Sequence, residues 1–403
     1  PTETMIPTVN VAPAKGWPEG QTPTAADGLT VNAFARGLNH PRSILVLPNG
    51  DVLVAESNAP PKEQSQGIRG FVMKMVMNRA GAGVPSPNKV ILLRDKDGDG
   101  MAEVRTNYIE GLKSPFGLAL IGDRLFVANA DSVVAFPYQE GAERIDSIPE
   151  KIVDLPGGPL NHHWTKSLLA SEDGKYLYVG VGSNSNVAEN GMDMEKDRAA
   201  ILQVDIAAKS YRLFATGLRN PVGMAWEPDT KALWTVVNER DELGSDLVPD
   251  YLTRVTDGGF YGWPYSYYGT HVDERVSPQR PDLVAKAIVP DYALGAHTAS
   301  LGLAFHDGEG WPAQFGKGAF IAQHGSWNRN PLSGYKVVFV SFENGQPQGD
   351  LRDVLTGFVN AEGEALGRPV SAAFDRTSAL LVTDDVGNAV WRVVAGPQTN
   401  AAN

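Results

Sequence analysis

A degenerate repeat recurs six times along the chain and limits the folds that it can adopt. In each copy a short polar loop, often containing proline, runs into a small or apolar stretch and then a strand-like segment. The loops are residues 39–42, 113–116, 161–164, 219–222, 295–297 and 366–369. Repetition of such units is typical of radial β-architectures, in which every copy places equivalent residues at equivalent positions.

Between these loops, short apolar runs rich in β-branched and aromatic residues alternate with glycine, proline and acidic turns. Examples are residues 44–47, 89–93, 176–180, 336–340 and 380–383. The sequence therefore predicts an all-β fold, a six-bladed β-propeller with four-stranded blades. The last strand, near 389–393, is expected to pair with residues near the N-terminus and close the ring. One short turn of helix is expected over 245–253.

We expect three parts: an extended N-terminal arm over residues 1–28, the propeller over 29–396 and a C-terminal tail over 397–403. Because the chain starts at Pro1 without methionine, we expect an exported protein, periplasmic or secreted, whose signal peptide has been removed.

Composition excludes several classes of function. The chain has no cysteine among 403 residues, so thiolate catalysis, cysteine-bound metals and c-type haem attachment are excluded. A net charge of −12 argues against nucleic acid and anionic membranes as partners. No apolar run reaches the ~18 residues of a membrane-spanning helix. Nucleotide-binding glycine motifs, zinc-protease motifs and the serine-hydrolase elbow are also absent.

The loops before the predicted inner strands are expected to converge on one end of the central channel. The residues expected to share this position are Arg42, Phe116, His163, Arg219 with Asn220, His297 and Arg368. One interpretation of polar residues in such loops is that they simply turn the chain. Buried cations of one sign, however, call for an anionic partner. Arginine binds carboxylates through two oxygens, so we expect a site for a polycarboxylate, to which Lys166 could contribute.

His163 is a candidate general base, because a neutral imidazole over the channel can accept a proton near pH 7. His162 is its expected supporting neighbour, and His297 is a candidate contact across the channel. The alternative for His163 is a structural histidine bonded to a backbone carbonyl.

Two segments suggest calcium. Asp95, Asp97, Asp99 and Glu103 have the spacing of the first half of an EF-hand loop, although Thr106 stands where its last glutamate belongs. The alternative is an exposed acidic turn. Residues 238–246 form a second loop rich in carbonyl and carboxylate oxygens, for which a solvated charge run is the alternative.

Several motifs together resemble the soluble pyrroloquinoline quinone (PQQ) sugar dehydrogenases, the glucose/sorbosone dehydrogenase family with its six-bladed propeller. The motifs are residues 217–224, 258–265, 295–303 and 324–329 with 334–335. The motif 324–329 is typical of the sorbosone-dehydrogenase-like branch, and the chain is also similar to the quinoprotein domain of fungal pyranose dehydrogenases.

The resemblance implies roles for individual residues. His163 takes the position of the general base, and Arg219 with Asn220 that of the pair that holds the quinone. Arg368 matches an arginine that binds a PQQ carboxylate, and Arg42 matches a first-blade cofactor contact. Calcium would lie at the backbone carbonyls of residues 240–242, which are Arg240, Asp241 and Glu242.

The chain also departs from the glucose-dehydrogenase pattern. Leu366 replaces one of two C-terminal arginines, and Trp327 or Arg329 takes the place of a cofactor-binding lysine. Glucose is therefore not the expected substrate. Trp164, Tyr265 and His324 are expected substrate contacts, and Tyr267, Tyr268 and Trp327 are further candidates for an aromatic platform, with core packing as the alternative.

The function implied is a PQQ- and calcium-dependent oxidoreductase that oxidises a hydroxyl of an aldose or sugar-derived aldehyde and passes electrons to an external cytochrome or quinone-type acceptor. Two alternatives stay open. One is a calcium-dependent propeller lactonase or hydrolase, and the other is a propeller that binds a ligand without catalysis.

Overall fold

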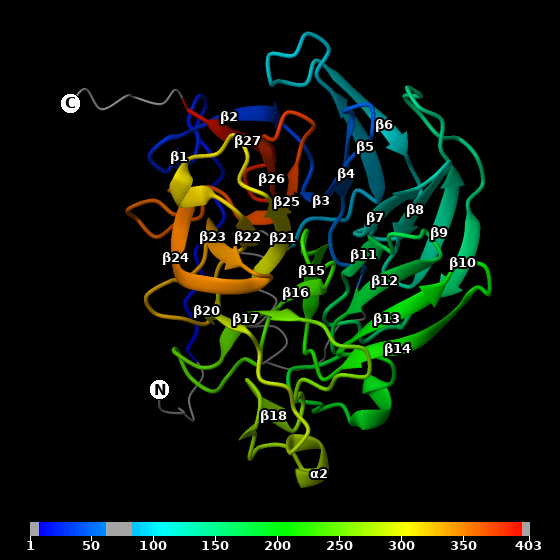
Figure 1. Cartoon of the computed structure of the whole chain (residues 1–403), viewed down its shortest axis with the longest axis vertical. Coiled ribbons are helices and arrows are strands. Elements are labelled where there is room, and N and C mark those ends of the chain that lie inside the picture. The colour runs from blue at the N-terminus through cyan, green and yellow to red at the C-terminus, as the bar shows by residue number, and fades with distance from the viewer. Residues whose placement is uncertain (1–7, 62–82, 397–403) are drawn as a thin grey trace.

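The computed structural model describes residues 8–61 and 83–396, and its strands form the six blades of a β-propeller (Figure 1). Each blade is an antiparallel meander, as the alternation of short apolar runs and turns predicts. In Figure 1 the chain passes once around the ring, from blue and cyan through green and yellow to orange and red. The all-β, six-bladed prediction is confirmed.

The first three blades follow the repeat copies in order. Blade 1 is β3 (Pro41–Val46), β4 (Val52–Glu56), β5 (Lys89–Arg94) and β6 (Val104–Ile109). Blade 2 is β7 (Leu118–Ile121), β8 (Arg124–Ala128), β9 (Ser132–Pro137) and β10 (Glu150–Asp154). Blade 3 is β11 (Lys166–Ala170), β12 (Tyr176–Val181), β13 (Ala200–Asp205) and β14 (Ser210–Thr216).

The other three blades show small variations. Blade 4 is β15 (Pro221–Trp226), β16 (Leu233–Val237), β17 (Pro249–Arg254) and β20 (Tyr292–Ala296). Blade 5 is β21 (Ser300–His306), β22 (Gly318–Gln323), β23 (Lys336–Glu343) and β24 (Gln346–Thr356), extended by β1 (Thr24–Ala25). Blade 6 is β25 (Pro369–Phe374), β26 (Leu380–Asp384), β27 (Ala389–Ala395) and β2 (Leu29–Arg36).

Few other elements lie within the described ranges. A two-stranded ribbon of β18 (Ser266–Tyr267) and β19 (His271–Val272) lies between β17 and β20 in the chain, with α2 (Pro281–Val284) after it. Two 3₁₀ turns are η1 (Met192–Glu195) and η2 (Ala313–Phe315). No helix in 8–61 or 83–396 is long and apolar enough to cross a bilayer.

The expected helical turn over 245–253 is wrong. Its second half is strand β17, which pairs with β16 on one side and β20 on the other. Tyr251, Leu252 and Thr253 are buried between neighbouring blades. Aromatic and β-branched side chains pack well on such a pleated, covered surface, so tertiary pairing outweighs the weak local helical signal.

The N-terminal strand closes the ring, as the sequence predicts. β2 pairs antiparallel with β27 from Leu29 opposite Ala395 to Arg36 opposite Ala389. The outer strand of the last blade thus comes from the start of the chain, and the blue β2 lies beside the red β27 in Figure 1. Closure removes the open sheet edge that a linear array would leave.

The core is divided among the interfaces between blades. Six apolar clusters each join two neighbouring blades; for example, Phe320 and Phe339 of blade 5 pack with Val382 and Trp391 of blade 6. The inner strands β3, β7, β11, β15, β21 and β25 each contact the next around the axis.

Glycines let the inner strands approach closely. A Cβ on Gly223 would lie 2.8 Å from the Leu301 carbonyl oxygen, and one on Gly302 would lie 2.7 Å from that of Val370. At these positions the inner strands of neighbouring blades are in backbone contact.

Candidate active site

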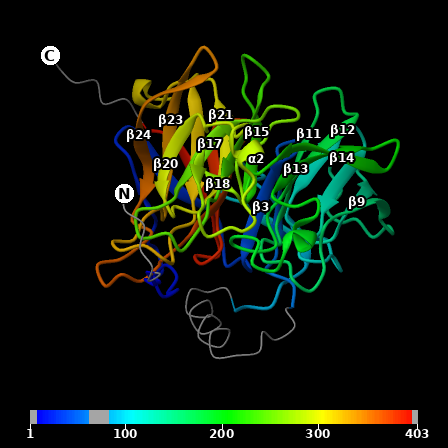
Figure 2. The same ribbon diagram turned by 90° about the horizontal axis from the view of Figure 1, so that it is seen from below.

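The candidate residues lie at one end of the propeller. In an antiparallel blade the start of the first strand lies beside the end of the second. The loops before the inner strands and the loops between second and third strands therefore gather at the same end; Figure 2 shows the loops at both ends of the blades from the side.

The strand register places the arginines differently from the prediction. Pro41, Pro221 and Pro369 each begin an inner strand and pair with the last residue of the second strand. Arg368 precedes its proline, whereas Arg42 follows its own. The expected shared position is therefore wrong for Arg42, because the proline at the strand start, and not the arginine, is the repeated element.

Arg42 instead lies at the axis over an apolar cluster. Its guanidinium carbon is 5.7 Å from the ring centroids of both Phe116 and Trp164. These two rings pack edge-to-face and share their cluster with Val222 and Val370 from the inner strands of blades 4 and 6. Phe116 and much of Trp164 therefore serve as packing at the centre of the ring.

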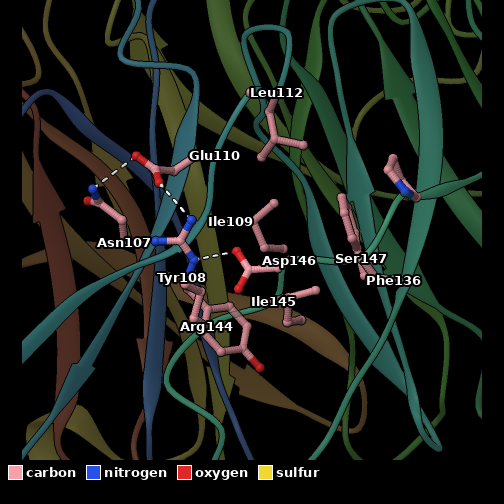
Figure 3. Close-up of a pocket in the computed structure, with 12 residues that line it drawn as sticks. Asn107, Tyr108, Ile109, Glu110, Leu112, Phe136, Arg144, Ile145, Asp146 and Ser147 are labelled. Carbon is pink, nitrogen blue, oxygen red and sulfur yellow. Dashed lines mark hydrogen bonds and ion pairs between the residues drawn. The ribbon is translucent and has the colours of Figure 1, made fainter.

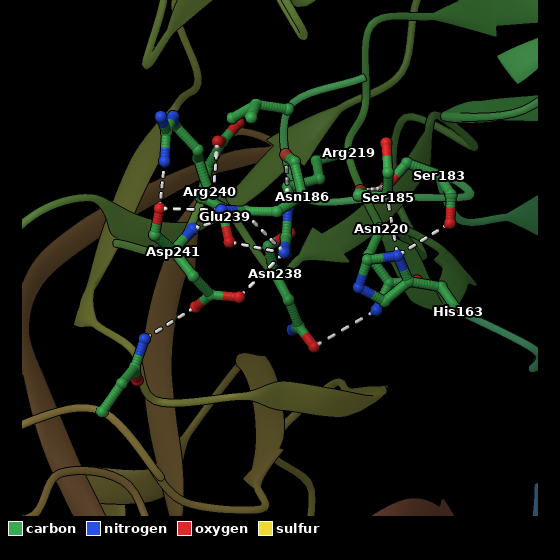
Figure 4. A network of polar contacts seen from close by, with 12 residues as sticks. His163, Ser183, Ser185, Asn186, Arg219, Asn220, Asn238, Glu239, Arg240 and Asp241 are labelled. Atoms are coloured by element: carbon green, nitrogen blue, oxygen red, sulfur yellow. Dashed lines mark hydrogen bonds and ion pairs between the residues drawn. The ribbon is translucent and has the colours of Figure 1, made fainter. Parts of the chain in front are cut away.

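One carboxylate, that of Asp241, holds three groups of the site together. It accepts hydrogen bonds from Arg219 at 2.8 Å and from Asn328 at 2.9 Å, and it lies 3.4 Å from His297. Burial alone would raise the pKa of Asp241, but Arg219 and His297 outweigh burial and hold this pKa well below its ordinary value. Figure 4 draws Arg219 and Asp241 within this network of polar contacts.

Arg219 is fixed on all sides. It is 2% exposed, and it also donates to the Glu239 carbonyl at 2.7 Å and to the Asn186 side chain at 3.0 Å. His297, expected across the channel, donates from Nε2 to the Gly244 carbonyl, and Asp241 raises its pKa against the effect of burial.

A second carboxylate, that of Asp385, performs the same role at blades 5, 6 and 1. It pairs with Arg42, bonds His324 at 2.9 Å and lies 3.7 Å from His40. Burial would raise the pKa of Asp385, but His324 and His40 together with Arg42 hold it far below the ordinary value. The buried charges of Arg42 and Arg219 are thus balanced inside the protein, which corrects the expectation that they need an external anion.

Arg368 differs from the other two arginines. It is 4% exposed, yet it forms no ion pair with any residue of 8–61 or 83–396. Its guanidinium lies 4.9 Å from the Tyr335 ring centroid, and its Nε has no hydrogen-bond partner. An unbalanced buried guanidinium is costly without an anionic partner, so Arg368 is the arginine best suited to bind a ligand carboxylate.

His163 is held through one ring nitrogen, and the other is available to a ligand. Its Nδ1 donates to the Ser183 carbonyl at 2.9 Å, which leaves the lone pair of Nε2 for a ligand. Burial, reinforced by Arg219 and His162, lowers the pKa of His163 well below 6.5. The imidazole is therefore neutral at neutral pH and able to accept a proton.

The contacts form one chain around the axis. Gly182 separates His163 from Asn220, since a Cβ there would lie 2.4 Å from the His163 Cβ and 2.3 Å from the Asn220 Oδ1. From Arg219 the chain continues through Asp241 and Asn328 to the loop 324–335 and returns through Asp385 to Arg42. Six of the predicted residues therefore belong to one constellation, which are Arg42, His163, Arg219, Asn220, His297 and His324.

Other predicted residues do not join this chain. Tyr265 packs with Val276 and Val284 under the β18–β19 ribbon. Arg329 pairs with Asp246 at 2.9 Å, and the Trp327 carbonyl accepts from the Asn10 backbone. Lys166 is fully buried and donates to the Trp164 carbonyl at 3.1 Å, and burial lowers its pKa.

The loop after β16 does not fit calcium as it stands. The carbonyl oxygens of Asp241 and Glu242 accept hydrogen bonds from the guanidinium groups of Arg240 and Arg275. A cation at these oxygens would have to displace two positive donors. The carbonyl of Arg240 has no hydrogen-bond donor in the described residues.

The acidic loop 95–103 joins β5 and β6 at the opposite end of blade 1. The ligand atoms of Asp95, Asp97, Asp99 and Glu103 lie within 4.8 Å of one another, and most of these side chains are exposed. Asp95 also accepts from the backbone of Gly98 and Gly100. Calcium at this loop stays a prediction.

Two small pockets lie outside the constellation or at its edge. One of about 190 Å³, drawn in Figure 3, is lined by Tyr108, Ile145 and their neighbours on β6 and the 144–149 loop, and none of the predicted site residues contributes to it. The other, of about 180 Å³, adjoins Asp385 and His40 and is bounded by residues 14–16.

Sequence reasoning missed the two carboxylate side chains and Gly182. Asp241 was expected to act only through its backbone, and Asp385 was not expected to act. Both follow second strands, in blades 4 and 6, and enter the same end of the ring as the arginines. Matching each buried cation with an acid at that end is the signal that could have found them.

A family model described as TrAA12-like matches residues 23–250 and 280–395. A pyrroloquinoline quinone-dependent sugar dehydrogenase of Hypocrea jecorina is 24% identical over 269 residues, which cover 61% of this chain and 57% of that protein. The alignment thus spans less than two thirds of this relative.

Two solved structures have the same fold. The holo form of the pyranose dehydrogenase PQQ domain from Coprinopsis cinerea superposes with a TM-score of 0.74 at 19% identity, covering 96% of this chain and 100% of that one. The calcium structure of the Trichoderma reesei family AA12 enzyme gives 0.75 at 21% identity, with 96% and 99% covered.

Proposed function

This chain belongs to the TrAA12-like family, and we propose that it is a PQQ-dependent dehydrogenase that oxidises a hydroxyl of an aldose or a sugar-derived aldehyde. The observation that carries this proposal is Arg368, a buried guanidinium without a carboxylate in the described residues. His163, which precedes an inner strand as Arg368 does, adds a neutral imidazole whose Nε2 is not used by its bond to Ser183. The PQQ-dependent relatives support the cofactor.

The residues present fit such a cofactor. PQQ carries three carboxylates and a quinone, and buried polar atoms without partners here include the Nε atoms of Arg368 and Arg42 and the Oδ1 of Asn220. Arg368 would hold a carboxylate, and Arg219 and Asn220 would lie at the quinone. When bound, PQQ supplies a two-electron acceptor for hydride.

The protein's part is to position groups and to move one proton. His163 Nε2 takes the proton of the reacting hydroxyl, while Nδ1–H stays anchored to Ser183 and fixes the ring. Arg219 places a positive charge beside this proton transfer. Its hydrogen bond to Asp241 keeps the guanidinium from reorienting.

Several finer points are proposals that rest on the resemblance and the relatives. The substrate is a small sugar or aldehyde, and electrons leave to an external cytochrome or quinone-type acceptor. Export to the periplasm or outside is proposed with them. Calcium is supported by the Trichoderma structure's calcium form, but the guanidinium groups that donate to carbonyls of the loop after β16 argue against it there, so no step is assigned to it.

The lactonase alternative needs free oxygen ligands around a central metal. The two buried carboxylates nearest the arginines, Asp241 and Asp385, are each bound to a guanidinium. This arrangement disfavours a central chelated cation and supports the dehydrogenase.

The test is titration of the purified protein with PQQ by absorbance, followed by an aldose panel with an artificial electron acceptor, with and without calcium. We expect PQQ binding and dye reduction. Absence of PQQ binding would overturn the proposal, and binding without turnover on any sugar would favour the non-enzymatic alternative.

A first prediction follows for the base. His163→Ala should lower kcat by about 10²–10⁴-fold, the usual contribution of a general base, while PQQ affinity changes little. The exposed His271 on β19 is a matched control, and His271→Ala should leave kcat unchanged. An equal loss of kcat in both variants would show that His163 is not the general base.

A further inference from the structure

Asp385 joins three blades at the edge of the proposed site. It follows β26 of blade 6, and its side chain is 3% exposed. It binds Arg42 from blade 1 and His324 from the loop after β22 of blade 5. The Nε2 of His324 lies 3.0 and 2.9 Å from the two carboxylate oxygens.

These contacts determine which nitrogen of His324 carries the proton. The Asp385 oxygen that bonds His324 at 2.9 Å also bonds Arg42, which keeps the carboxylate ionised. An ionised carboxylate can only accept hydrogen bonds, so Nε2 must be the donor and Nδ1 must carry a lone pair. No residue in the described part of the chain donates to Nδ1.

The His324 ring is positioned to meet a ligand. Its side chain is 20% exposed, unlike the almost fully buried Asp385. Burial, helped by Arg368 and Arg42, lowers the pKa of His324 to about 4 against the pull of Asp385. The ring is therefore neutral and acts as an acceptor at neutral pH.

The backbone beneath His324 is fixed. Its N–H donates to the Ala299 carbonyl at 2.8 Å, and that of Gly325 donates to the Thr298 carbonyl at 3.0 Å. Four residues further on, Asn328 binds Asp241. The loop 324–335 thus connects the two carboxylates and places His324 between Arg42 and the Arg219 side of the ring.

We propose that Asp385 is a positioning residue that holds His324 in the Nε2–H tautomer, so that Nδ1 accepts a hydrogen bond from a sugar hydroxyl other than the one His163 deprotonates. This inference rests on the proposed function for the identity of the ligand. The tautomer itself does not depend on it.

The first test needs no activity. In apo protein labelled with ¹⁵N-histidine, the resonances missing from His324→Gln identify His324, and we expect the Nε2–H pattern in the wild type. In Asp385→Asn the amide oxygen stays with Arg42 and the amide NH₂ donates to Nε2 of His324. The proton of the ring then moves to Nδ1, so the Nδ1–H pattern should replace the Nε2–H pattern. A wild-type Nδ1–H pattern, or no change in Asp385→Asn, would overturn the proposal.

The second test uses kinetics at saturating PQQ. Asp385→Asn and His324→Gln should each raise KM for the best aldose about tenfold, the value of one hydrogen bond, with a smaller change in kcat. The double variant should be no worse than either single one, because Asp385 acts through His324. Additive losses would contradict this.

Asp375→Asn is the matched control, since Asp375 lies in the same blade and pairs with Arg392 at 3.1 Å away from the site loops. It should change neither KM nor the histidine spectrum. If the wild type neither binds PQQ nor oxidises any sugar, the proposed function fails, while the spectrum still decides whether Asp385 sets the tautomer.

Discussion

At the scale of single residues, Gly182 sets the distance between the proposed base and the proposed quinone contact. It directly follows β12, and its missing side chain lets both His163 and Asn220 approach its backbone. Any side chain here must push one of them away. The position therefore transmits a change of one methyl group directly to the reacting groups.

We predict that Gly182→Ala lowers kcat by about 100-fold, since a displacement of about 1 Å can have that effect. Steady-state kinetics with PQQ at saturation measure it. Gly316→Ala is the control, because the nearest atom to its added Cβ lies at an ordinary 3.5 Å. A Gly182→Ala enzyme with full activity would show that His163 and Asn220 need not be so close.

The lowered pKa of His163 predicts the acid side of the pH profile. Burial, with Arg219 and His162, favours the neutral imidazole, so the ring stays unprotonated as the pH falls through 6.5. We expect kcat/KM to hold at pH 6.5 and to fall only at lower pH. A profile measured on protein shown to be folded at each pH checks this, and an acid limb at or above 6.5 would contradict it.

At the same scale, the sequence indicated the cations and the base better than their partners. His163, Arg219, Asn220, Arg42 and His324 do come together. Their counter-ions were not predicted. Asp385 is distant in sequence from Arg42 and His324, and Asp241 is one of several acidic residues in the loop after β16. Which acid meets which arginine depends on blade packing and has no local pattern.

At the scale of elements, ring closure depends on a strand pair from opposite ends of the chain. β27 of blade 6 carries Trp391, which is fully buried, donates to Asp384 at 3.0 Å and packs edge-to-face on Trp17 with centroids 5.4 Å apart. Trp17 belongs to the segment before β2. The side chain therefore ties the N-terminal segment to the last blade.

Trp391→Ala should destabilise the protein by about 3–5 kcal/mol, the range for removing a large buried aromatic side chain. Urea unfolding followed by fluorescence and by circular dichroism measures the change. Trp391→Phe keeps most of the volume and should cost clearly less. A loss below about 1 kcal/mol for the alanine variant would show that closure does not rely on this contact.

The strands were predictable because their alternation and their turns are local. The predicted runs 44–47, 89–93, 176–180, 336–340 and 380–383 all overlap strands of the structure. The predicted helical turn over 245–253 was wrong because β17 pairs with β16 and β20, and this pairing decides the conformation of the segment. Pairing between distant segments outweighed the local preference there.

At the scale of the whole molecule, the proposed cofactor would touch several blades at once and should stabilise the ring. Ligand at about 100 times its Kd stabilises the native state by about 2.7 kcal/mol. We therefore expect PQQ to raise the thermal midpoint of the apo protein. This rise in the thermal midpoint should be lost in Arg368→Ala at the same PQQ concentration, because a carboxylate of PQQ then loses its guanidinium partner.

The exposed Arg376, in the β25–β26 turn of the same blade, is the control, and Arg376→Ala should keep the full shift. Thermal unfolding followed by circular dichroism gives the midpoints. A full shift in Arg368→Ala would place the ligand elsewhere.

The sequence by itself determined the repeat, the strands and the sixfold count, and it indicated the proposed base and the cations, because strand and turn chemistry and residue type are local properties. Tertiary structure alone decided that the prolines, not the arginines, are equivalent between blades, that Asp241 and Asp385 neutralise Arg219 and Arg42, and that Arg368 is left without a described acid. The reason is physical: a buried charge is balanced by whatever the folded chain brings within hydrogen-bonding distance, and that depends on packing between blades.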